Sequence, residues 1–168
     1  GTDLPEYYEH YGGCVIGTTI NKFTYVMIHP RSDKTFQSFS PDFQKHSKPV
    51  KLNKMEIEDG TEISSAIIKY LNYKNGLDVI LCSDVPAGSG LGASSSLAVN
   101  LINTLNFINN KKLNSTEIAE TAFKIERKIL NWPMGKQDEY LTVTGGLQFF
   151  EFKQNKVIRF YRSNRRKS

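Results

Sequence analysis

The sequence predicts an α+β fold. Strand-like runs come first, apolar stripes with helical spacing follow in the middle, and a second pair of strand-like runs lies near the end. This order favours a sandwich of sheet and helices over a doubly wound parallel sheet. We expect residues 1–168 to form one domain, with a basic tail over residues 158–168 that is frayed at its end.

The first third of the chain is rich in β-branched and aromatic residues. Residues 14–19 and 23–28 therefore indicate two strands. A polar stretch over residues 30–49 is expected to form a long loop, the kind of segment that is often functional. Alternation of apolar and polar residues over 51–57 predicts another strand, which a turn at residues 58–60 ends.

The middle of the chain is dominated by helical spacing. Apolar residues recur at this spacing over residues 63–71 and again over 97–108, and each stripe predicts a helix. Between them, residues 77–82 form a short apolar run that reads as a strand. A further helix is expected to begin near Asn114, because Glu117 completes a pair typical of a capping box.

The end of the chain reads as a hairpin. The sequence Trp132-Pro133 should end the preceding helix, because proline cannot continue it. Residues 147–152 and 157–161 then predict two strands joined through residues 154–155.

Composition excludes several classes of protein. No run of about 18 apolar residues predicts a transmembrane helix, and the first residues carry no signal-peptide pattern. Cys14 and Cys82 lie in strand-like runs and are expected to be buried and reduced. The histidines show no metal-ligand spacing. We therefore expect a cytoplasmic protein without a structural zinc site.

A glycine-rich turn between the 77–82 strand and the 97–108 helix carries the strongest chemical signal. Glycines let a backbone approach a ligand closely, and the first turn of a helix offers unpaired N–H groups and a positive dipole end. Together these features form a cradle for phosphate. The expected phosphate-binding residues are Pro86, Gly88, Ser89, Gly90, Leu91, Gly92, Ala93, Ser94, Ser95 and Ser96.

Three other interpretations compete for this turn. It could be a tightly packed strand–turn–helix whose serines only cap the helix. Gly88, Gly90 and Ala93 also fit a dinucleotide-binding fingerprint, but no second strand follows to complete the required βαβ unit. A Walker-type loop fails because no lysine follows the glycines.

The run from Pro86 to Ser95 resembles the second signature motif of the GHMP kinases, a superfamily that includes galactokinase, homoserine kinase and mevalonate kinase. In that family the motif is the loop that binds the triphosphate of ATP. Most members have serine where Ala93 stands here, which removes one hydroxyl. The resemblance implies the family's α+β N-terminal domain, a sandwich like a ribosomal-protein domain, with ATP and Mg²⁺ as cofactors.

The same resemblance assigns a metal ligand and a catalytic residue. It implies that Glu126 and Ser94 bind Mg²⁺, a cation that prefers hard oxygen ligands. Without the family, Glu126 would be a rim residue that pairs with Lys124 or Lys128. Asp138 would be the general base that faces the substrate hydroxyl, although an aspartate on a glycine-containing turn is often only a turn former.

The substrate is suggested by residues 1–8 (GTDLPEYY), which look like the first motif of the bacterial D-glycero-D-manno-heptose phosphate kinases. The likeness implies that Asp3 hydrogen-bonds sugar hydroxyls, although Asp3 could equally cap a turn. The implied reaction converts a heptose 7-phosphate and ATP into the 1,7-bisphosphate. Lys22 or Arg31 could meet the sugar phosphate. The substrate-binding residues expected by resemblance are Thr2, Asp3, Gly135 and Gln137.

By the same resemblance, this chain lacks a strand before Gly1 and a ferredoxin-like C-terminal domain, so we expect it to be inactive or weak alone. One alternative is another GHMP sugar kinase, of the fucose or hexosamine type. A second is a non-catalytic fragment that binds a nucleotide, or RNA through its basic tail; the net charge is +5. We expect ATP and a phosphosugar as partners, and neither nucleic acid nor membrane. A homodimer is left open.

Overall fold

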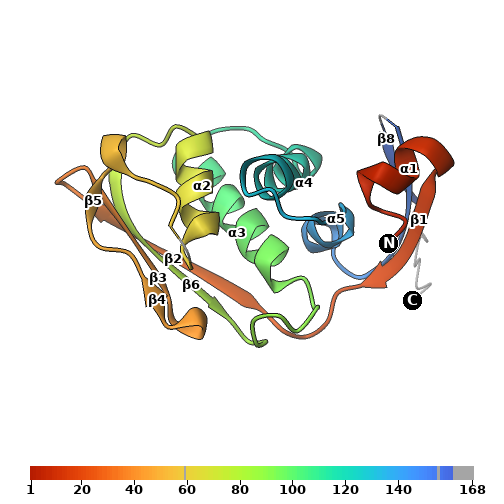
Figure 1. Ribbon diagram of the computed structural model, residues 1–168, viewed down its shortest axis with the longest axis horizontal. Helices are drawn as coiled ribbons and strands as arrows, with labels where there is room; N and C mark the ends of the chain where they lie inside the picture. Colours follow the sequence, from red (N-terminus) through yellow and green to blue (C-terminus); the bar gives the residue numbers. More distant parts are fainter. Residues whose placement is uncertain (59, 155, 161–168) are drawn as a thin grey trace, which may run out of the picture.

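The computed structural model describes residues 1–58, 60–154 and 156–160, and its two β-sheets enclose the helices between them (Figure 1). The elements in chain order are α1 (Pro5–Tyr11), β1 (Gly13–Thr18), β2 (Thr24–Arg31), β3 (Thr35–Ser40), η1 (Pro41–Phe43), β4 (Lys45–His46), β5 (Val50–Lys51), η2 (Leu52–Lys54), α2 (Glu62–Tyr70), β6 (Gly76–Ser83), α3 (Ala93–Ile108), α4 (Ser115–Lys124), the π-helical η3 (Ile125–Ile129), α5 (Gln137–Thr144), β7 (Leu147–Lys153) and β8 (Lys156–Phe160).

The five-stranded sheet has the strand order β2-β6-β3-β4, and the short β5 also pairs with β3. β2 is antiparallel to β6 and β3 is parallel to it. The register of β2 and β6 pairs Thr24 with Ser83, so the start of β2 lies beside the end of β6. The chain just before Thr24 therefore lies next to the glycine-rich turn that follows Ser83.

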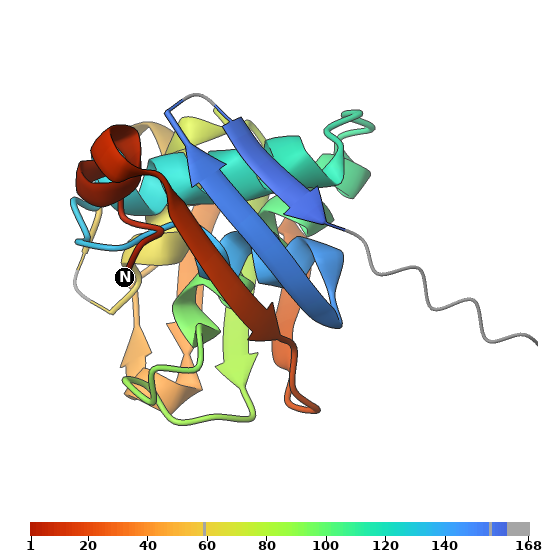
Figure 2. The ribbon, with the colours of Figure 1, turned by 90° about the vertical axis from the view of Figure 1, so that its right-hand side faces the viewer.

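The three-stranded sheet has the order β1-β7-β8, and both of its strand pairs are antiparallel. β1 and β7 contact α5, and β7 also contacts α1 (Figure 2). β1 and β2 are consecutive in the chain but belong to different sheets. The link over residues 19–23 thus joins the two layers close to the glycine turn.

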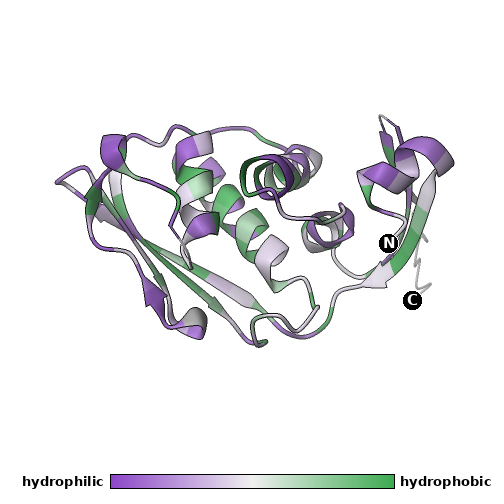
Figure 3. Ribbon diagram, in the orientation of Figure 1, coloured by the Kyte–Doolittle hydropathy of each residue, from purple (hydrophilic) through white to green (hydrophobic). Residues whose placement is uncertain are grey.

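The core has two parts. The larger part lies between the five-stranded sheet and helices α2, α3 and α4, and includes Phe36, Ile67 and Leu101, each without exposed surface. The smaller part lies under the three-stranded sheet, where Tyr8 packs with Phe152. Figure 3 shows hydrophobic residues along the strands and within α3, a helix of the larger part.

Most of the predicted elements are confirmed. The strands over 14–19, 23–28 and 77–82 correspond to β1, β2 and β6, and the stripes over 63–71 and 97–108 correspond to α2 and α3. The capping box is confirmed as well, because the Glu117 N–H donates to Asn114 Oδ1 at 3.0 Å and the Asn114 N–H donates to Glu117 Oε2 at 2.7 Å.

The prediction of a long loop over residues 30–49 is wrong. This stretch holds β3 and β4, and β3 alternates half-buried with buried side chains. Ser38 and Ser40 are buried members of that strand, and their polarity makes the stretch resemble a loop. Burial is tolerated because Ser38 Oγ lies 2.7 Å from Ser64 Oγ and the Ser38 N–H donates to Ser47 Oγ at 2.9 Å.

Three further expectations need correction. Residues 51–57 are not a strand, because only Val50–Lys51 pairs with β3 and η2 follows directly. Cys14 is exposed rather than buried, because it lies on the outer face of β1, and Cys82 is half-buried. Neither α1 nor α5 is predicted from the sequence, because helices of seven and eight residues are too short to show a clear stripe.

Some predictions fall outside the described residues. The turn at 58–60 includes residue 59 and the hairpin turn includes residue 155. Residues 161–168 of the predicted tail also lie outside, whereas residues 158–160 belong to β8. In the part of the chain that the structure describes, no helix has both the length and the apolar character to cross a membrane.

Candidate active site

The glycine turn has the backbone of a ligand cradle. Gly88, Gly90 and Gly92 all have positive φ, at 73°, 73° and 70°, a conformation that favours glycine. A Cβ placed on Gly92 would lie only 3.0 Å from Asp138 Cγ. Glycine at 92 therefore permits both the backbone conformation and the close approach of Asp138.

Helix α3 begins directly after this turn. Its N-cap is Gly92, which has no side chain to cap the helix, and the first helical bond runs from the Ser96 N–H to the Gly92 carbonyl at 2.9 Å. The amides of residues 93–95 come before that bond and have no intrahelical acceptor. The helix start thus presents N–H groups and its positive dipole end toward the turn.

The three serines at the start of α3 point in different directions, as successive helical residues must. Ser94 lines a cavity beside the turn. Ser95 is buried and donates a hydrogen bond to Glu126 Oε1 at 3.3 Å. Ser96 Oγ lies 2.9 Å from Thr24 Oγ1 and so ties α3 to β2. Of the three hydroxyls, only that of Ser95 contacts Glu126.

Two cavities meet at the glycine turn. The first, called the loop cavity, has a volume of about 350 Å³ and is lined by Ser83, Ser94 and residues 87–90. The second, called the strand cavity, has a volume of about 320 Å³ and is lined by residues 15–20, Lys22 and Gln137. Both cavities are also lined by the residues Gly90, Gly92 and Asp138.

Asp138 lies in the first turn of α5, where the two cavities join. Burial raises the pKa of its carboxyl above the usual aspartate value, and the negative charge of Asp3 adds to the rise. A carboxylate with a raised pKa is a better proton acceptor. The side chain predicted as the general base therefore faces both cavities and has the electrostatics of a base.

Glu126 lies in η3 and has no exposed surface. Burial raises the pKa of its carboxyl to about 8, and the hydrogen bond from Ser95 opposes that rise. Its Oε2 atom has no hydrogen-bond partner. The rim-residue alternative is wrong, because within the described residues this carboxylate forms no ion pair with Lys124 or Lys128.

Glu139 lies beside Glu126 and is missed by sequence analysis. It has no exposed surface, and neither carboxylate oxygen has a hydrogen-bond partner. Burial and the charge of Glu126 raise the pKa of its carboxyl. The only sign in the sequence is its position next to Asp138, which does not tell a buried acid from an exposed one in the first turn of a helix.

These residues fit a magnesium ion that is held partly by phosphate. Glu126 Oε2 is a buried, hard oxygen without a partner, which is the kind of ligand that Mg²⁺ takes. Among the residues the structure describes, no cluster of three or more His, Cys, Asp or Glu could hold a metal. A cation here would therefore need ligands from nucleotide phosphates and water as well, as is usual for Mg²⁺.

The predicted substrate residues mostly hold the start of α5. The side chain of Asp3 is 3% exposed and accepts a hydrogen bond from the Gln137 N–H at 3.2 Å, so it caps this helix. A Cβ on Gly135 would lie 1.9 Å from Asp3 Oδ2. The Thr2 hydroxyl donates to the Cys14 carbonyl at 2.7 Å. Of these four residues, only Gln137 lines the strand cavity.

Lys136 fixes the start of α5 from the other side. Its Nζ lies 2.7 Å from Glu120 Oε1 and 5.0 Å from the centre of the Phe123 ring. The Tyr140 hydroxyl donates to the same Glu120 oxygen at 2.6 Å. Because α4 and α5 are tied together in this way, Asp138 is held on a rigid support.

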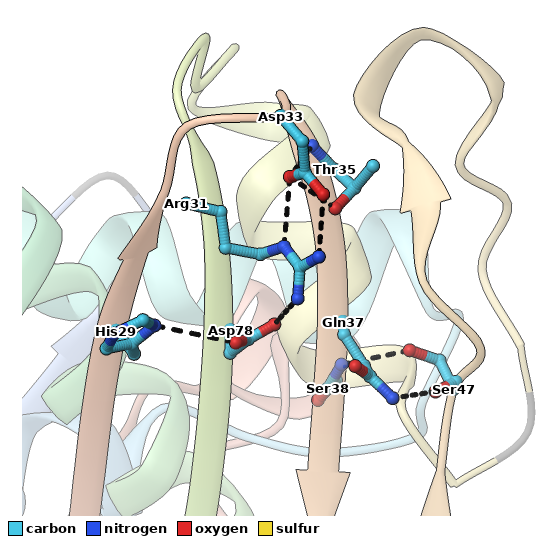
Figure 4. A network of polar contacts seen from close by, with 8 residues as sticks. All are labelled: His29, Arg31, Asp33, Thr35, Gln37, Ser38, Ser47 and Asp78. Atoms are coloured by element: carbon cyan, nitrogen blue, oxygen red, sulfur yellow. Dashed lines mark hydrogen bonds and ion pairs between the residues drawn. The ribbon is translucent and has the colours of Figure 1, made fainter.

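The two cations suggested for the sugar phosphate lie in different places. Lys22 lines the strand cavity and is the only cation among the described residues that do so. Arg31 lies at the opposite end of β2, where it donates to Asp33 at 2.7 and 3.0 Å and to Asp78 at 3.0 Å (Figure 4). Of these two cations, Lys22 is therefore the one that lies beside the glycine turn.

An apolar hollow adjoins the loop cavity. It has a volume of about 200 Å³ and is lined by Leu81 and Trp132. Ile63, Ser94 and Leu97 line both this hollow and the loop cavity. The start of α3 therefore has a polar cavity and an apolar hollow side by side.

Comparisons with known proteins agree on one family. Residues 61–146 match the family model described as the GHMP kinases N terminal domain. Over 163 residues the chain is 35% identical to the D-glycero-alpha-D-manno-heptose 7-phosphate kinase of Campylobacter jejuni, with 94% of this chain and 48% of that protein covered. It is 27% identical over 148 residues to a galactokinase of Chloroflexus aurantiacus, with 84% and 38% covered.

A solved structure gives the same answer for the fold. The crystal structure of a D-glycero-D-manno-heptose 1-phosphate kinase from Bacteroides thetaiotaomicron superposes with a TM-score of 0.87 at 29% identity, and the match covers 95% of this chain and 54% of that one. The chain spans about half the length of the relatives it matches.

Proposed function

The chain belongs to the GHMP kinase family, and we propose on that premise that it binds ATP at the glycine turn and phosphorylates a hydroxyl of a phosphorylated sugar. One observation carries the proposal: Asp138 stands where the loop cavity meets the strand cavity. A base at that junction can reach an acceptor hydroxyl on one side while the phosphate of a nucleotide lies on the other.

The nucleotide would occupy the loop cavity. The amides of residues 93–95 at the start of α3 have no intrahelical acceptor and can donate hydrogen bonds to a triphosphate, and a Cβ on Gly88 or Gly90 would meet nothing within 4 Å. The apolar hollow beside Trp132 suits the flat base of the nucleotide. Ser94 faces the same cavity and supplies a hydroxyl.

Mg²⁺ would be held by Glu126 and a hydroxyl of the α3 start, with phosphate oxygens completing its shell; it would neutralise charge on the phosphates. Ser94 is the hydroxyl implied by the family, whereas Ser95 is the one that contacts Glu126. The free amides at the start of α3 would help to stabilise that charge by donating hydrogen bonds to phosphate oxygens.

The acceptor would enter the strand cavity. Asp138 accepts the proton of the sugar hydroxyl, the sugar oxygen bonds to the γ-phosphorus, and the bond from that phosphorus to the departing ADP breaks. Such a base contributes roughly 10²–10⁴-fold to the rate, and positioning supplies much of the rest. Lys22 suits a phosphate on the sugar.

The best-supported acceptor is the anomeric hydroxyl of D-glycero-D-manno-heptose 7-phosphate, which would give the 1,7-bisphosphate. The 35% identity to a protein named as a heptose 7-phosphate kinase supports this substrate. A panel of heptose 7-phosphate, galactose, fucose and N-acetylhexosamine, followed by coupled detection of ADP, tests it. Turnover of the unphosphorylated sugars at equal or better kcat/KM would contradict the heptose assignment.

Replacing Asp138 tests the chemistry. In the full-length protein, Asp138→Asn should lower kcat by roughly 100-fold or more, because the amide cannot accept the proton of the sugar hydroxyl. Nucleotide affinity measured by calorimetry should change little. Asp33→Asn is the matched control, because Asp33 lies in the Arg31 network far from the cavities. An unchanged kcat in Asp138→Asn would refute the assigned role.

A further inference from the structure

Three buried side-chain atoms in the described part of the chain have no hydrogen-bond partner, and all belong to one place. They are Glu126 Oε2 and both carboxylate oxygens of Glu139. Buried polar groups in folded proteins are almost always paired, and an unpaired buried carboxylate is especially costly. The partner that each carboxyl group has among the described residues is the other one: burial raises the pKa of both, and a proton on one of them can bridge Glu126 and Glu139.

The nearby cations are already engaged. Lys136 pairs with Glu120, Arg127 pairs with Glu6, and Lys124 lies 5.2 Å from the centre of the Tyr70 ring. Within the described residues no ion pair involves Glu126 or Glu139. Two adjacent carboxylates thus face each other without a compensating positive charge from the protein.

The position of Glu139 connects this place to the active site. It follows Asp138 directly in the first turn of α5, so its side chain leaves the helix in another direction, toward Glu126. Glu126 in turn receives the Ser95 hydroxyl from the first turn of α3. Two helix starts that border the loop cavity therefore place two carboxylates and a hydroxyl side by side.

We propose that Glu139 is a second carboxylate of the divalent-cation site, acting with Glu126 and a serine hydroxyl of α3. This rests on the proposed function, because the cation would arrive with the phosphates of the nucleotide. Hard oxygen ligands are those that Mg²⁺ and Mn²⁺ prefer. A divalent cation would replace the proton that bridges the two carboxyl groups, and its charge matches that of the two carboxylates left behind.

Manganese binding tests the proposal, because electron paramagnetic resonance measures the concentration of free Mn²⁺ and needs no catalytic activity. Mn²⁺ would be titrated into the protein with saturating ADP. Glu139→Gln should weaken Mn²⁺ binding roughly tenfold, the lower end of what removal of a supporting metal-site residue costs. ADP affinity without metal should stay within about twofold of the wild-type value.

A folding check on Glu139→Gln, a second substitution at Glu139 and a control elsewhere exclude a loss of Mn²⁺ binding that comes only from misfolding. Glu139→Gln keeps the size of the side chain and removes one of two like charges, so thermal unfolding should show a folded protein. Glu139→Asp keeps the charge on a shorter side chain and should bind Mn²⁺ more tightly than Glu139→Gln. Glu151→Gln is the matched control, because Glu151 lies on β7 and pairs with Lys153; its Mn²⁺ affinity should equal that of the wild type.

The outcomes separate the two proposals. If the wild type binds Mn²⁺ with ADP and Glu139→Gln binds it equally well, Glu139 has no part in the cation site and only this inference is overturned. If the wild type binds neither ADP nor Mn²⁺, the proposed function is overturned and this inference with it.

Discussion

At the scale of single residues, three side chains divide the work between the two cavities. Ser94 faces the loop cavity, Lys22 faces the strand cavity, and Asp138 faces both. This division matches a reaction in which a phosphoryl group passes from one cavity to the other. Under the proposed function, the hydroxyl would serve the phosphates of the nucleotide, the carboxylate the acceptor hydroxyl and the cation the phosphate of the sugar.

Lys22 gives the residue-scale prediction. Lys22→Ala should raise KM for heptose 7-phosphate about tenfold with little change in kcat, because a hydrogen bond to a charged group contributes roughly 1.5–3 kcal/mol and about 1.4 kcal/mol is tenfold in affinity. The KM for an unphosphorylated heptose should not change. A coupled ADP assay with both sugars measures the difference.

The control for Lys22 is Arg31→Ala, which removes a cation at the far end of β2 and should leave both KM values as they are. If Lys22→Ala raised KM equally for the phosphorylated and the unphosphorylated sugar, the lysine would not be recognising the phosphate.

The residues of the site were predictable to different degrees. The glycine turn lies in a short run whose residues indicate a phosphate loop, whereas Asp138 is indicated only through the resemblance to a family. Which serine meets Glu126 depends on where α3 begins, and a shift of one residue turns a side chain by about 100°. The burial of Glu139 depends on how the start of α5 folds back beside Glu126 of η3, which no pattern within α5 itself reveals.

At the scale of elements, the glycine turn and the start of α3 form one unit. This unit fixes the distance between the backbone of the turn and the side chain of Asp138. The positive φ of Gly92 turns the chain into the helix, and its missing side chain lets Asp138 pack against the backbone. The turn is therefore specified by sterics on both sides. The hydroxyls of the serines add to this frame but do not create it.

Gly92→Ala tests that unit. The added methyl would meet Asp138 at 3.0 Å and would hold an L-residue in the left-handed region, which costs about 1–2 kcal/mol. Calorimetry should show affinity for ATP with Mg²⁺ lowered about tenfold or more. Gly146→Ala is the control: its φ is 66° and a Cβ there meets nothing within 4 Å.

This comparison distinguishes strain from contact. Both variants place an alanine at a positive φ, so equal losses of nucleotide affinity would mean that the contact with Asp138 is irrelevant. We expect Gly146→Ala to lose some thermal stability and to keep the affinity of the wild type.

Helix α1 packs on β7 through an aromatic contact in which the Tyr8 and Phe152 rings lie 5.9 Å apart. Burial, with smaller effects of Glu9 and Glu120, raises the pKa of Tyr8 from 10.0 to about 12. The fold thus favours the protonated phenol. Stability from this shift is complete below pH 10 and is lost as the pH rises through about 12.

Tyr8→Phe keeps the ring and removes the hydroxyl that ionises. This variant should therefore not lose stability at alkaline pH in the way that the wild type does. Absorbance at 295 nm, measured as wild type minus variant, should show the Tyr8 phenol ionising near pH 12. A midpoint close to pH 10 in this difference would mean that α1 does not pack on β7 as described.

Among the elements, sequence patterns predicted those that rest on side-chain chemistry along one segment. β2, α2 and α3 are rich in apolar residues with a clear period. β3 was not predicted because its polar residues are typical of a loop. The buried Ser38 finds its hydrogen-bond partners, Ser47 and Ser64, in other segments. α1 and α5 are short, and α5 is fixed by Asp3 and Lys136 rather than by an apolar stripe.

At the scale of the whole molecule, the site lies where the two sheets come closest along the chain. β1 of the three-stranded sheet leads through Lys22 into β2, whose start pairs with the end of β6 just before the glycine turn. The N-terminal segment returns to the same place, because Asp3 caps α5. The strand cavity therefore draws residues from β1, α3 and α5, and the loop cavity draws residues from β6, α2, α3 and α5.

The central claim is that the backbone between Gly88 and Ser96 holds the phosphates of a nucleotide beside Asp138. The most direct measurement is the amide NMR spectrum of the ¹⁵N-labelled chain, titrated with ATP and Mg²⁺. The account predicts that the largest shifts fall on the amides of residues 88–96, followed by those around Asp138. Shifts that are absent, or that gather elsewhere while residues 88–96 stay unmoved, would contradict it.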